Sequence, residues 1–258
     1  MPFQRSVRVL GVFLVSIFML SSSCSTGDKK LSPDDQAKLY LQVAMGYLRE
    51  KDTTSALRQV FEAESISPDY ADVHHLKAMI YMITNEIDSA ITSSQIALKL
   101  NPKSSASHNL LGNLLMSKRE FNEAEEHLKL SAADPLFTDN FKSKTALGII
   151  EYRRGNLSKA ELHLQRAIGA NPTSACDAYY YLGQVFLIQG KVDSAITQLE
   201  RGSHKQCSMN PETLLSLGDA YARQKKFDAA RKELVFIQAN FPDTEYAQRA
   251  VDKLKYLP

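Results

Sequence analysis

An alanine recurs along this chain at a nearly constant interval. The intervals are 34, 34, 36, 35 and 35 residues, and the six positions are Ala56, Ala90, Ala124, Ala160, Ala195 and Ala230. A small residue stands twelve positions before each alanine: Ala44, Ala78, Gly112, Gly148, Gly183 and Gly218. Four positions after it comes Val60, Ser94, Leu128, Leu164, Leu199 or Leu234. Six copies of one frame at this period predict stacked units, each a pair of antiparallel helices that cross at the small residues.

The frame resembles the tetratricopeptide repeat. The segments LGNLLMSKREFNEAEEHL and LGDAYARQKKFDAARKEL carry the resemblance, which extends from Ala37 to about Pro242. A single helix pair cannot bury its apolar stripe, whereas stacked pairs can. The resemblance implies an all-α fold. We expect a right-handed superhelix of six helix pairs over residues 33–242 and a C-terminal capping helix over residues 243–258.

The N-terminus has the pattern of an export signal. Arg5 and Arg8 precede an apolar run from Val9 to Leu20, and three serines and Cys24 follow. A run of this length is too short to span a bilayer comfortably, because about 20 residues are needed. A positive start, a short apolar run and small residues are typical of a secretory signal peptide.

The cysteine directly after the small residues makes segment 1–23 resemble a bacterial lipoprotein signal. Ser21 stands where that family prefers leucine, and this is the one departure. The resemblance implies that Cys24 is lipidated and that residues 24–32 form a tether. Because Ser25 follows in place of aspartate, it also implies a lipid-anchored protein on the periplasmic face of the outer membrane. A plain cleaved signal and a free N-terminal anchor are the alternatives.

Two other cysteines, Cys176 and Cys207, fall at related places in the repeat frame. Cys176 opens the first helix of unit five, and Cys207 lies four residues before Pro211, which opens the first helix of unit six. Both therefore belong to the same edge of adjacent stacked helices, in a chain expected to reach an oxidising compartment. We predict a disulfide between them. The alternative is two free, small apolar residues in helix-start loops.

The sequence contains no pattern typical of catalysis or of metal binding. Its six histidines lack an HExxH or comparable spacing, and no G-x-S-x-G, P-loop or Cys-x-x-Cys segment occurs. Without residues 1–23 the chain carries 29 basic and 29 acidic residues, and the absence of a basic stripe argues against nucleic acid as a partner. We therefore predict a monomeric protein that binds protein partners, with no catalytic residues, no cofactor and no metal.

In the tetratricopeptide family, fixed positions of each first helix line the concave face. In units one to three these positions are largely apolar and rich in methionine, which suits an adaptable apolar partner segment. The predicted partner-binding groove consists of Leu41, Met45, Leu48, His75, Met79, Met82, Ile83, Asn109, Asn113 and Met116. Later units are more mixed and include Thr145, Ile149, Tyr152, Tyr180 and Gln184. The competing interpretation is that neighbouring helices or the tether cover these side chains.

The linker between units three and four makes the chain resemble one particular group of tetratricopeptide-repeat lipoproteins. It reads ADPLFTDNFKSKTALGIIEYRRG, with Asp134, Pro135, Leu136 and Phe137 ahead of a Leu-Gly helix. A lipoprotein of this length with six repeats and this linker resembles the type IV pilus pilotins. The resemblance implies an outer-membrane lipoprotein that binds the pilus secretin and promotes its outer-membrane localisation and multimerisation.

Two other classes of protein remain open. One is a scaffold for peptidoglycan enzymes or for outer-membrane β-barrel assembly, which would use the same lipid and repeats. The other is an enzyme subunit or activator, which requires active-site residues that the sequence does not offer. The neighbouring genes would discriminate among these classes, because a fold alone does not fix a function.

Overall fold

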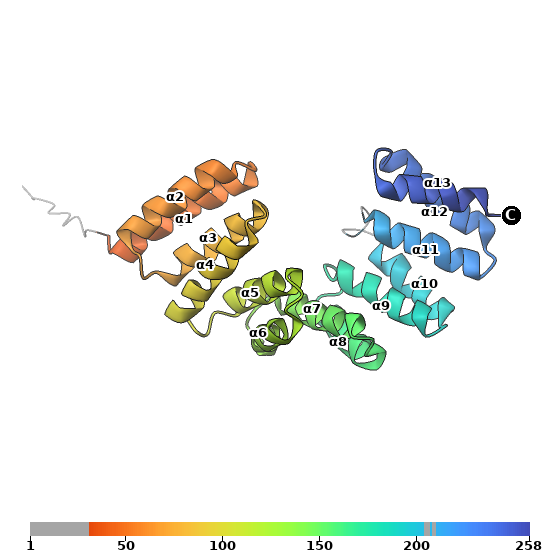
Figure 1. Cartoon of the computed structure of the whole chain (residues 1–258), viewed down its shortest axis with the longest axis horizontal. Helices are drawn as coiled ribbons and strands as arrows, with labels where there is room; N and C mark the ends of the chain where they lie inside the picture. The colour runs from red at the N-terminus through yellow and green to blue at the C-terminus, as the bar shows by residue number, and fades with distance from the viewer. Residues whose placement is uncertain (1–30, 204–206, 208–209) are drawn as a thin grey trace, which may run out of the picture. The chain divides into compact units, whose positions relative to one another are not determined.

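The computed structural model describes residues 31–203, 207 and 210–258, so the predicted signal peptide and Cys24 lie outside the described residues. Within this part of the chain there are thirteen α-helices and no strand (Figure 1). They are α1 (Pro33–Arg49), α2 (Thr53–Ile66), α3 (Ala71–Ile83), α4 (Ile87–Leu100), α5 (Ser105–Ser117), α6 (Phe121–Ala133), α7 (Asn140–Arg153), α8 (Leu157–Ala170), α9 (Cys176–Ile188), α10 (Val192–Gly202), α11 (Pro211–Arg223), α12 (Phe227–Asn240) and α13 (Glu245–Lys255). No helix among these described residues is both long and apolar enough to cross a membrane.

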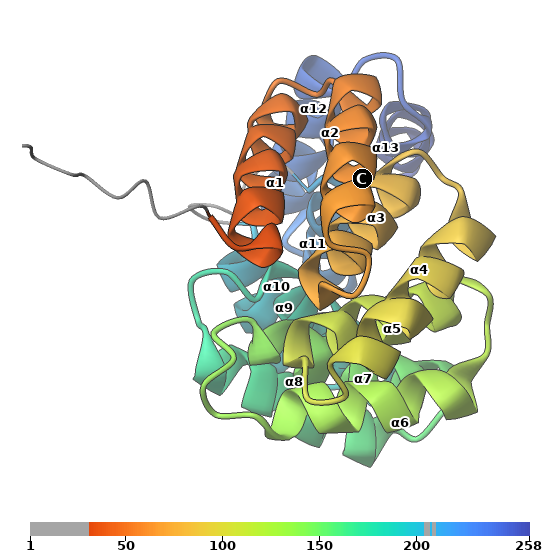
Figure 2. The same cartoon turned by 90° about the vertical axis from the view of Figure 1, so that its left-hand side faces the viewer.

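Consecutive helices pack as six pairs, α1 with α2 through α11 with α12, and α13 packs on the last pair. We number these pairs as units one to six. Each odd-numbered helix also contacts the next odd-numbered helix, whereas pairs of even-numbered helices make at most marginal contact in the part that the structure describes. The inner side of a curved stack is shorter than its outer side, so the odd-numbered helices line the inner face (Figures 1 and 2). Six helix pairs and a C-terminal capping helix are confirmed.

The repeat frame marks the place where the two helices of a unit cross. All six frame alanines are fully buried. In units three to five, a Cβ added to the glycine of the first helix would lie 2.6 Å from the Cγ of the leucine on the second helix. These pairs are Gly112 with Leu128, Gly148 with Leu164 and Gly183 with Leu199. In units one and two the first helix has alanine in place of glycine, and the second helix has a residue smaller than leucine. These pairs are Ala44 with Val60 and Ala78 with Ser94. A larger residue on one helix of the crossing is therefore paired with a smaller residue on the other helix.

The turn inside each unit passes through the left-handed backbone region at one equivalent residue. The six residues and their φ angles are Lys51 (63°), Asn85 (63°), Arg119 (63°), Gly155 (78°), Gly190 (74°) and Lys225 (61°). Glycine adopts this region without steric cost, whereas a side chain with a Cβ is disfavoured there by about 1–2 kcal/mol.

We expect the turn residues to respond to substitution in opposite directions. Lys225→Gly should raise the free energy of unfolding by up to about 1 kcal/mol, because relief of backbone strain outweighs the added freedom of the unfolded chain. Gly190→Ala should lower it by about 1 kcal/mol, because alanine is strained at positive φ. Urea denaturation followed by circular dichroism measures both changes. A shift of the same sign for both variants would contradict this explanation.

Two histidines of unit three share one hydrogen bond. His108 Nε2 lies 3.1 Å from the carbonyl oxygen of Pro102, so this nitrogen carries a proton and donates it. The Nδ1 atom of neutral His108 is then an acceptor, and it lies 2.9 Å from Nδ1 of His127, which donates. The bond requires His108 to stay neutral, and it ties the first helix of the unit to the second.

This pair predicts a pH dependence of stability. Burial, and next the neighbouring His108 ring, lower the pKa of His127, against a smaller opposing effect of Glu123 and Glu126. The folded state therefore binds its proton less readily than the unfolded chain, whose histidine pKa is about 6.5, so stability falls as the pH drops below that value. We expect His127→Gln, which keeps a donor toward His108, to make the loss between about pH 7 and pH 5 shallower. Melting temperatures measured across this range should show it, and an unchanged slope would exclude the pair as a source.

Candidate partner-binding face

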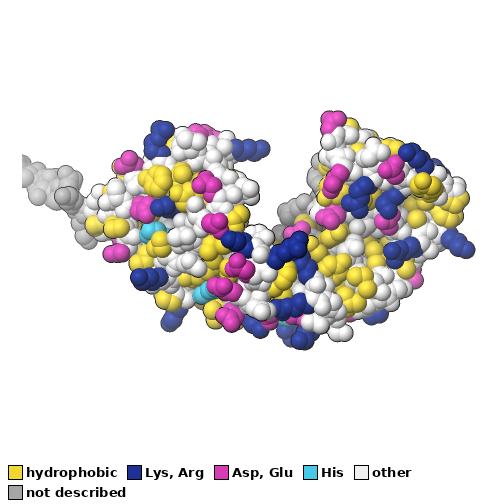
Figure 3. Space-filling model, viewed as in Figure 1, with side chains coloured by type: hydrophobic (Ala, Val, Ile, Leu, Met, Phe, Trp, Pro, Cys, Tyr) yellow, Lys and Arg dark blue, Asp and Glu magenta, His cyan; other side chains and the backbone are white. Residues whose placement is uncertain are grey.

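Part of the predicted groove is an exposed apolar strip on the inner face. Met45 of α1 is 48% exposed, and Met82 and Ile83 of α3 are 39% and 55% exposed. Leu48, Met79 and Met116 are half-buried. In the view of Figure 3, hydrophobic side chains lie in separate patches over the first units and over the last ones. Flexible methionine side chains at such a surface suit an apolar partner segment.

Leu41, which the sequence analysis placed in the partner-binding groove, does not belong to this exposed strip. Only 8% of Leu41 is exposed, and it belongs to the core cluster that α1, α2 and α3 form around Val60 and Leu76. The packing of unit one against unit two covers this side chain, so the expectation that it is available to a partner is wrong. A charge introduced at Leu41 would disturb folding, because an unpaired buried charge is costly.

Two polar residues of the predicted groove, His75 and Asn109, connect neighbouring inner helices, whereas Asn113 bonds within α5. His75 Nδ1 on α3 lies 3.0 Å from Ser107 Oγ on α5. Asn109 Nδ2 on α5 donates to Ser143 Oγ on α7 at 2.7 Å, and Asn113 Nδ2 donates to the Asn109 carbonyl oxygen at 2.8 Å. Burial lowers the pKa of His75, with a smaller opposing effect of Asp72, so the ring is held neutral near pH 7. The side chains of His75 and Asn109 therefore hold successive units in register.

The inner face is hollowed where units three, four and five meet. The hollow has a volume of about 260 Å³. Asn113 of α5, Lys142 and Ile149 of α7, and Cys176 and Asp177 of α9 contribute to its lining. The space lies further along the array than the methionine-rich strip, and it has an apolar wall beside two charged side chains of opposite sign.

The inner face of units four to six carries tyrosines and carboxylates, a combination that the sequence analysis did not select. The ring centroids of Tyr152 and Tyr181 are 5.5 Å apart and those of Tyr180 and Tyr181 are 5.0 Å apart, both edge-on. The Tyr180 hydroxyl donates to Glu212 Oε1 at 2.9 Å. We call these three tyrosines, with Asp177 and Glu212, the tyrosine strip. The clue in the sequence was an acidic residue at the second position of both units five and six.

A second hollow of about 1030 Å³ lies on the outer side of units five and six. Side chains of α10 and α12, including Glu200, Lys232 and Phe236, line it above Leu214 and Leu217 of α11. Helix α10 has 11 residues, whereas the other even-numbered helices have 13 or 14. Because α10 ends early, it lacks the last helical turn that the even-numbered helix of the other units has, and the hollow lies beside this end.

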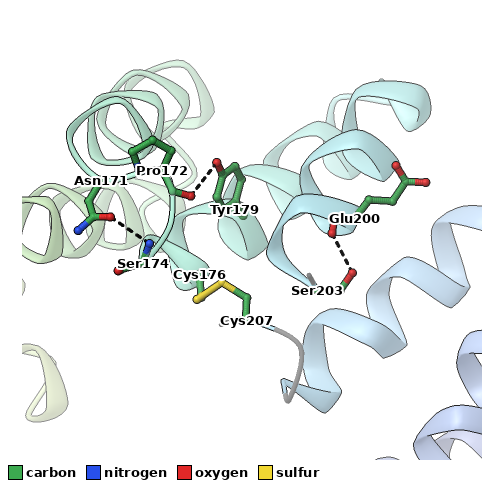
Figure 4. Close-up of a disulfide and its surroundings, with 8 residues drawn as sticks. All are labelled: Asn171, Pro172, Ser174, Cys176, Tyr179, Glu200, Ser203 and Cys207. Atoms are coloured by element: carbon green, nitrogen blue, oxygen red, sulfur yellow. Dashed lines mark hydrogen bonds between the residues drawn. A yellow bond between two sulfur atoms is a disulfide. The ribbon is translucent and has the colours of Figure 1, made fainter. Parts of the chain in front are cut away.

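The disulfide predicted from the repeat frame joins Cys176 to Cys207, with their Cα atoms 5.4 Å apart (Figure 4). Cys176 is the first residue of α9, and Cys207 lies in the linker between α10 and α11. The preceding loop is held by the Tyr179 hydroxyl, which donates to the Pro172 carbonyl oxygen at 3.1 Å, and by the Ser174 amide, which donates to Asn171 Oδ1 at 3.1 Å. The bond closes a loop that contains the whole helix pair of unit five.

Comparison with known proteins agrees with this architecture. Tetratricopeptide-repeat models match residues 71–104, 145–208 and 182–235. The type IV pilus assembly protein PilF of Pseudomonas aeruginosa is 24% identical over 170 residues, which make up 64% of this chain and 68% of PilF. The crystal structure of PilW, a widely conserved type IV pilus biogenesis factor, matches with a TM-score of 0.74 at 23% identity, over 84% of this chain and 98% of PilW. A structure of Pseudomonas aeruginosa PilF matches with a TM-score of 0.75 at 18% identity, over 86% of this chain and all of that one. Tetratricopeptide-repeat models therefore match parts of this chain, its sequence is similar to that of the type IV pilus assembly protein PilF, and its fold is that of the PilF and PilW structures.

Proposed function

We propose that this protein is an outer-membrane lipoprotein pilotin, which binds the subunit of the type IV pilus secretin and promotes its outer-membrane localisation and multimerisation. The observation that carries the proposal is the sequence relationship to PilF, a type IV pilus assembly protein, over 170 residues. The lipoprotein-like start of the chain, with Cys24 after a short apolar run, supports attachment to a membrane. The work of such a protein is binding and positioning, and it involves no reaction step.

The exposed apolar strip supplies the contact for the secretin segment. Met45, Met82 and Ile83 present flexible or branched apolar side chains to solvent on two neighbouring inner helices. A partner segment that covers them gains the free energy of removing apolar surface from water, about 25 cal/mol per Å². The lipid on Cys24 keeps the array at the membrane where the secretin assembles.

The test replaces exposed side chains that do not support the fold. Met45→Glu combined with Met82→Glu should leave the helical circular dichroism and the melting temperature near those of the wild type, because both residues are at least 39% exposed. The variant should lose heat-stable secretin multimers and surface pili, because residues at the centre of an interface contribute about 2 kcal/mol or more each. Immunoblots of unboiled membranes and electron microscopy of cells measure these outcomes.

A matched control comes from the outer side of the array. Leu130 of α6 is 58% exposed on an even-numbered helix, so Leu130→Glu adds a charge away from the inner face. This variant should assemble secretin normally. Wild-type multimer levels in the folded Met45→Glu, Met82→Glu variant would show that the secretin does not bind at this strip. Co-purification with cell-wall enzymes or the β-barrel assembly machinery in place of the secretin would overturn the pilotin assignment.

The membrane anchor has a separate test. Cys24→Ala should leave the protein either soluble in the periplasm or uncleaved at the inner membrane, because the acceptor for the lipid is gone. Incorporation of radiolabelled palmitate measures the modification directly. Equal incorporation by the wild type and the variant would refute lipidation at this cysteine.

A further inference from the structure

Two carboxylates of the tyrosine strip have no cationic partner among the described residues. Asp177 and Glu212 are both exposed, and neither forms an ion pair with any side chain that the structure describes. Partial burial of its carboxylate, and next the charge of Glu212, raise the pKa of Asp177, so the two carboxylates repel each other across the boundary between units five and six. A positive charge placed between them would relieve this repulsion.

The basic side chains of the same region contact other residues or lie too far away. Lys142 Nζ lies 2.7 Å from Asp139 Oδ2, and Lys253 Nζ lies 2.7 Å from Asp219 Oδ1. The Arg249 guanidinium lies 5.8 Å from the centroid of the Tyr246 ring. Arg223 is at the opposite end of α11 from Glu212, eleven residues away and so about 16 Å along the helix. Among the described residues, no basic side chain is therefore placed to neutralise the two carboxylates.

Three tyrosine rings lie on the same strip as the carboxylates and suit the same cation. Tyr152, Tyr180 and Tyr181 are half-buried and packed edge-on against one another. The hydrogen bond from Tyr180 to Glu212 fixes one ring beside one carboxylate. Aromatic faces attract ammonium and guanidinium groups, and the attraction grows when water is excluded. The strip therefore combines two features that recognise lysine and arginine side chains.

The adjoining hollow has room for the aliphatic part of such a side chain. Asp177 lines the hollow of about 260 Å³ together with Ile149 and Cys176. Lysine and arginine bury their methylene stems against apolar surface while the charged end stays with polar partners. Anionic surfaces, such as acidic lipids or nucleic acids, are disfavoured here because Asp177 and Glu212 would repel them.

We propose that the tyrosine strip docks an extended, lysine- or arginine-bearing segment of a protein partner. Cationic side chains of that segment pair with Asp177 and Glu212 and lie against Tyr152, Tyr180 and Tyr181, and one of their stems enters the hollow. This surface is separate from the methionine-rich strip of units one and two. The proposal rests on the proposed function only in taking the inner face as a surface that binds a protein partner.

The experiment measures binding of a defined probe to the purified full-length protein in detergent. The probe is a fluorescein-labelled peptide of alternating lysine and alanine, and the control peptide has glutamate in place of lysine. Fluorescence anisotropy should show binding of the lysine peptide that weakens with added salt, and no binding of the glutamate peptide. The Asp177→Asn, Glu212→Gln variant should bind the lysine peptide at least about tenfold more weakly, because both charge pairs are lost. Tyr181→Leu, which keeps an apolar side chain but removes a ring, should also weaken binding.

A second charge variant tests whether the loss of peptide binding comes from a specific site or only from the change in net charge. Glu123→Gln with Glu126→Gln removes the same number of negative charges from α6, an outer helix, and should bind the lysine peptide as the wild type does. Failure of the wild type to bind the lysine peptide, or an equal loss in both charge variants, would overturn the proposal. The peptide assay contains no secretin, so its result and that of the multimer assay fail or succeed independently.

Discussion

Replacing Cys176 and Cys207 together by serine is expected to lower the free energy of unfolding by about 3–4 kcal/mol in the chain-entropy model of disulfide stabilisation. The two residues are separated by 31 positions, so the bond removes a large closed loop from the freedom of the unfolded chain. Urea denaturation of oxidised wild type, reduced wild type and the double variant, followed by circular dichroism, measures the effect. Both changes are made together so that no unpaired thiol remains.

Reduced wild type and the double serine variant should unfold at the same urea concentration, and oxidised wild type at a higher one. The fluorescence of Tyr179 and of other tyrosines in units five and six should report the loss, because the bond encloses that part of the stack. Thiol labelling of protein extracted from cells under denaturing, non-reducing conditions should find both cysteines blocked. Two labelled thiols would show that the bond does not form in the cell.

Gly183→Ala is expected to destabilise the fold by about 1–3 kcal/mol, although alanine is the better helix former, because the added methyl group overpacks the helix crossing. A Cβ at this position would lie 2.6 Å from Cγ and 2.7 Å from Cδ2 of Leu199. Adding Leu199→Val should recover much of the loss, since unit one already combines alanine with valine at these two positions. Melting curves of both single variants and the double variant form a cycle whose coupling energy isolates this contact.

Gly46 is the control for this cycle. It lies inside α1, and a Cβ added to it would meet nothing within 4 Å. Gly46→Ala should therefore stabilise the protein by about 0.5–1 kcal/mol through helix propensity alone. A stabilising effect of Gly183→Ala of the same size would show that the stack relaxes freely at the crossing and would refute the size-matching explanation.

Local and periodic features of the sequence predicted the fold well. The alanine frame identifies the helix crossings because the same steric requirement recurs in every unit, and the frame alanines are all fully buried. The start of α1 follows from Ser32, whose hydroxyl accepts the Asp35 amide at 3.1 Å, and from Pro33 in the first helical position. The disulfide followed from the repeat register, because Cys176 and Cys207 belong to the same edge of adjacent units.

Features that depend on contacts between units were harder to predict. Leu41 has an inner-face register position, but its burial is decided by how α3 packs against α1. The partner of Asn109, Ser143, lies two positions before the equivalent of Asn109 in unit four, so the repeat register gives the neighbouring helix but not the partner residue. Asp177 and Glu212 become neighbours only when α9 and α11 stack. The early end of α10 leaves the alanine interval unchanged, so the period could not reveal the hollow beside it.

The covalent link around unit five also determines how this molecule carries a mechanical load. Consider the molecule pulled from the two ends of its chain. Tension that arrives at Cys176 passes directly through the sulfur atoms to Cys207, so α9 and α10 lie outside the path of the force. The chain enclosed by the bond cannot be drawn out, and the fully stretched molecule is shorter by roughly 100 Å than its length implies, for 31 residues at about 3.3–3.6 Å each. Single-molecule pulling would see this missing length reappear when the cysteines are reduced.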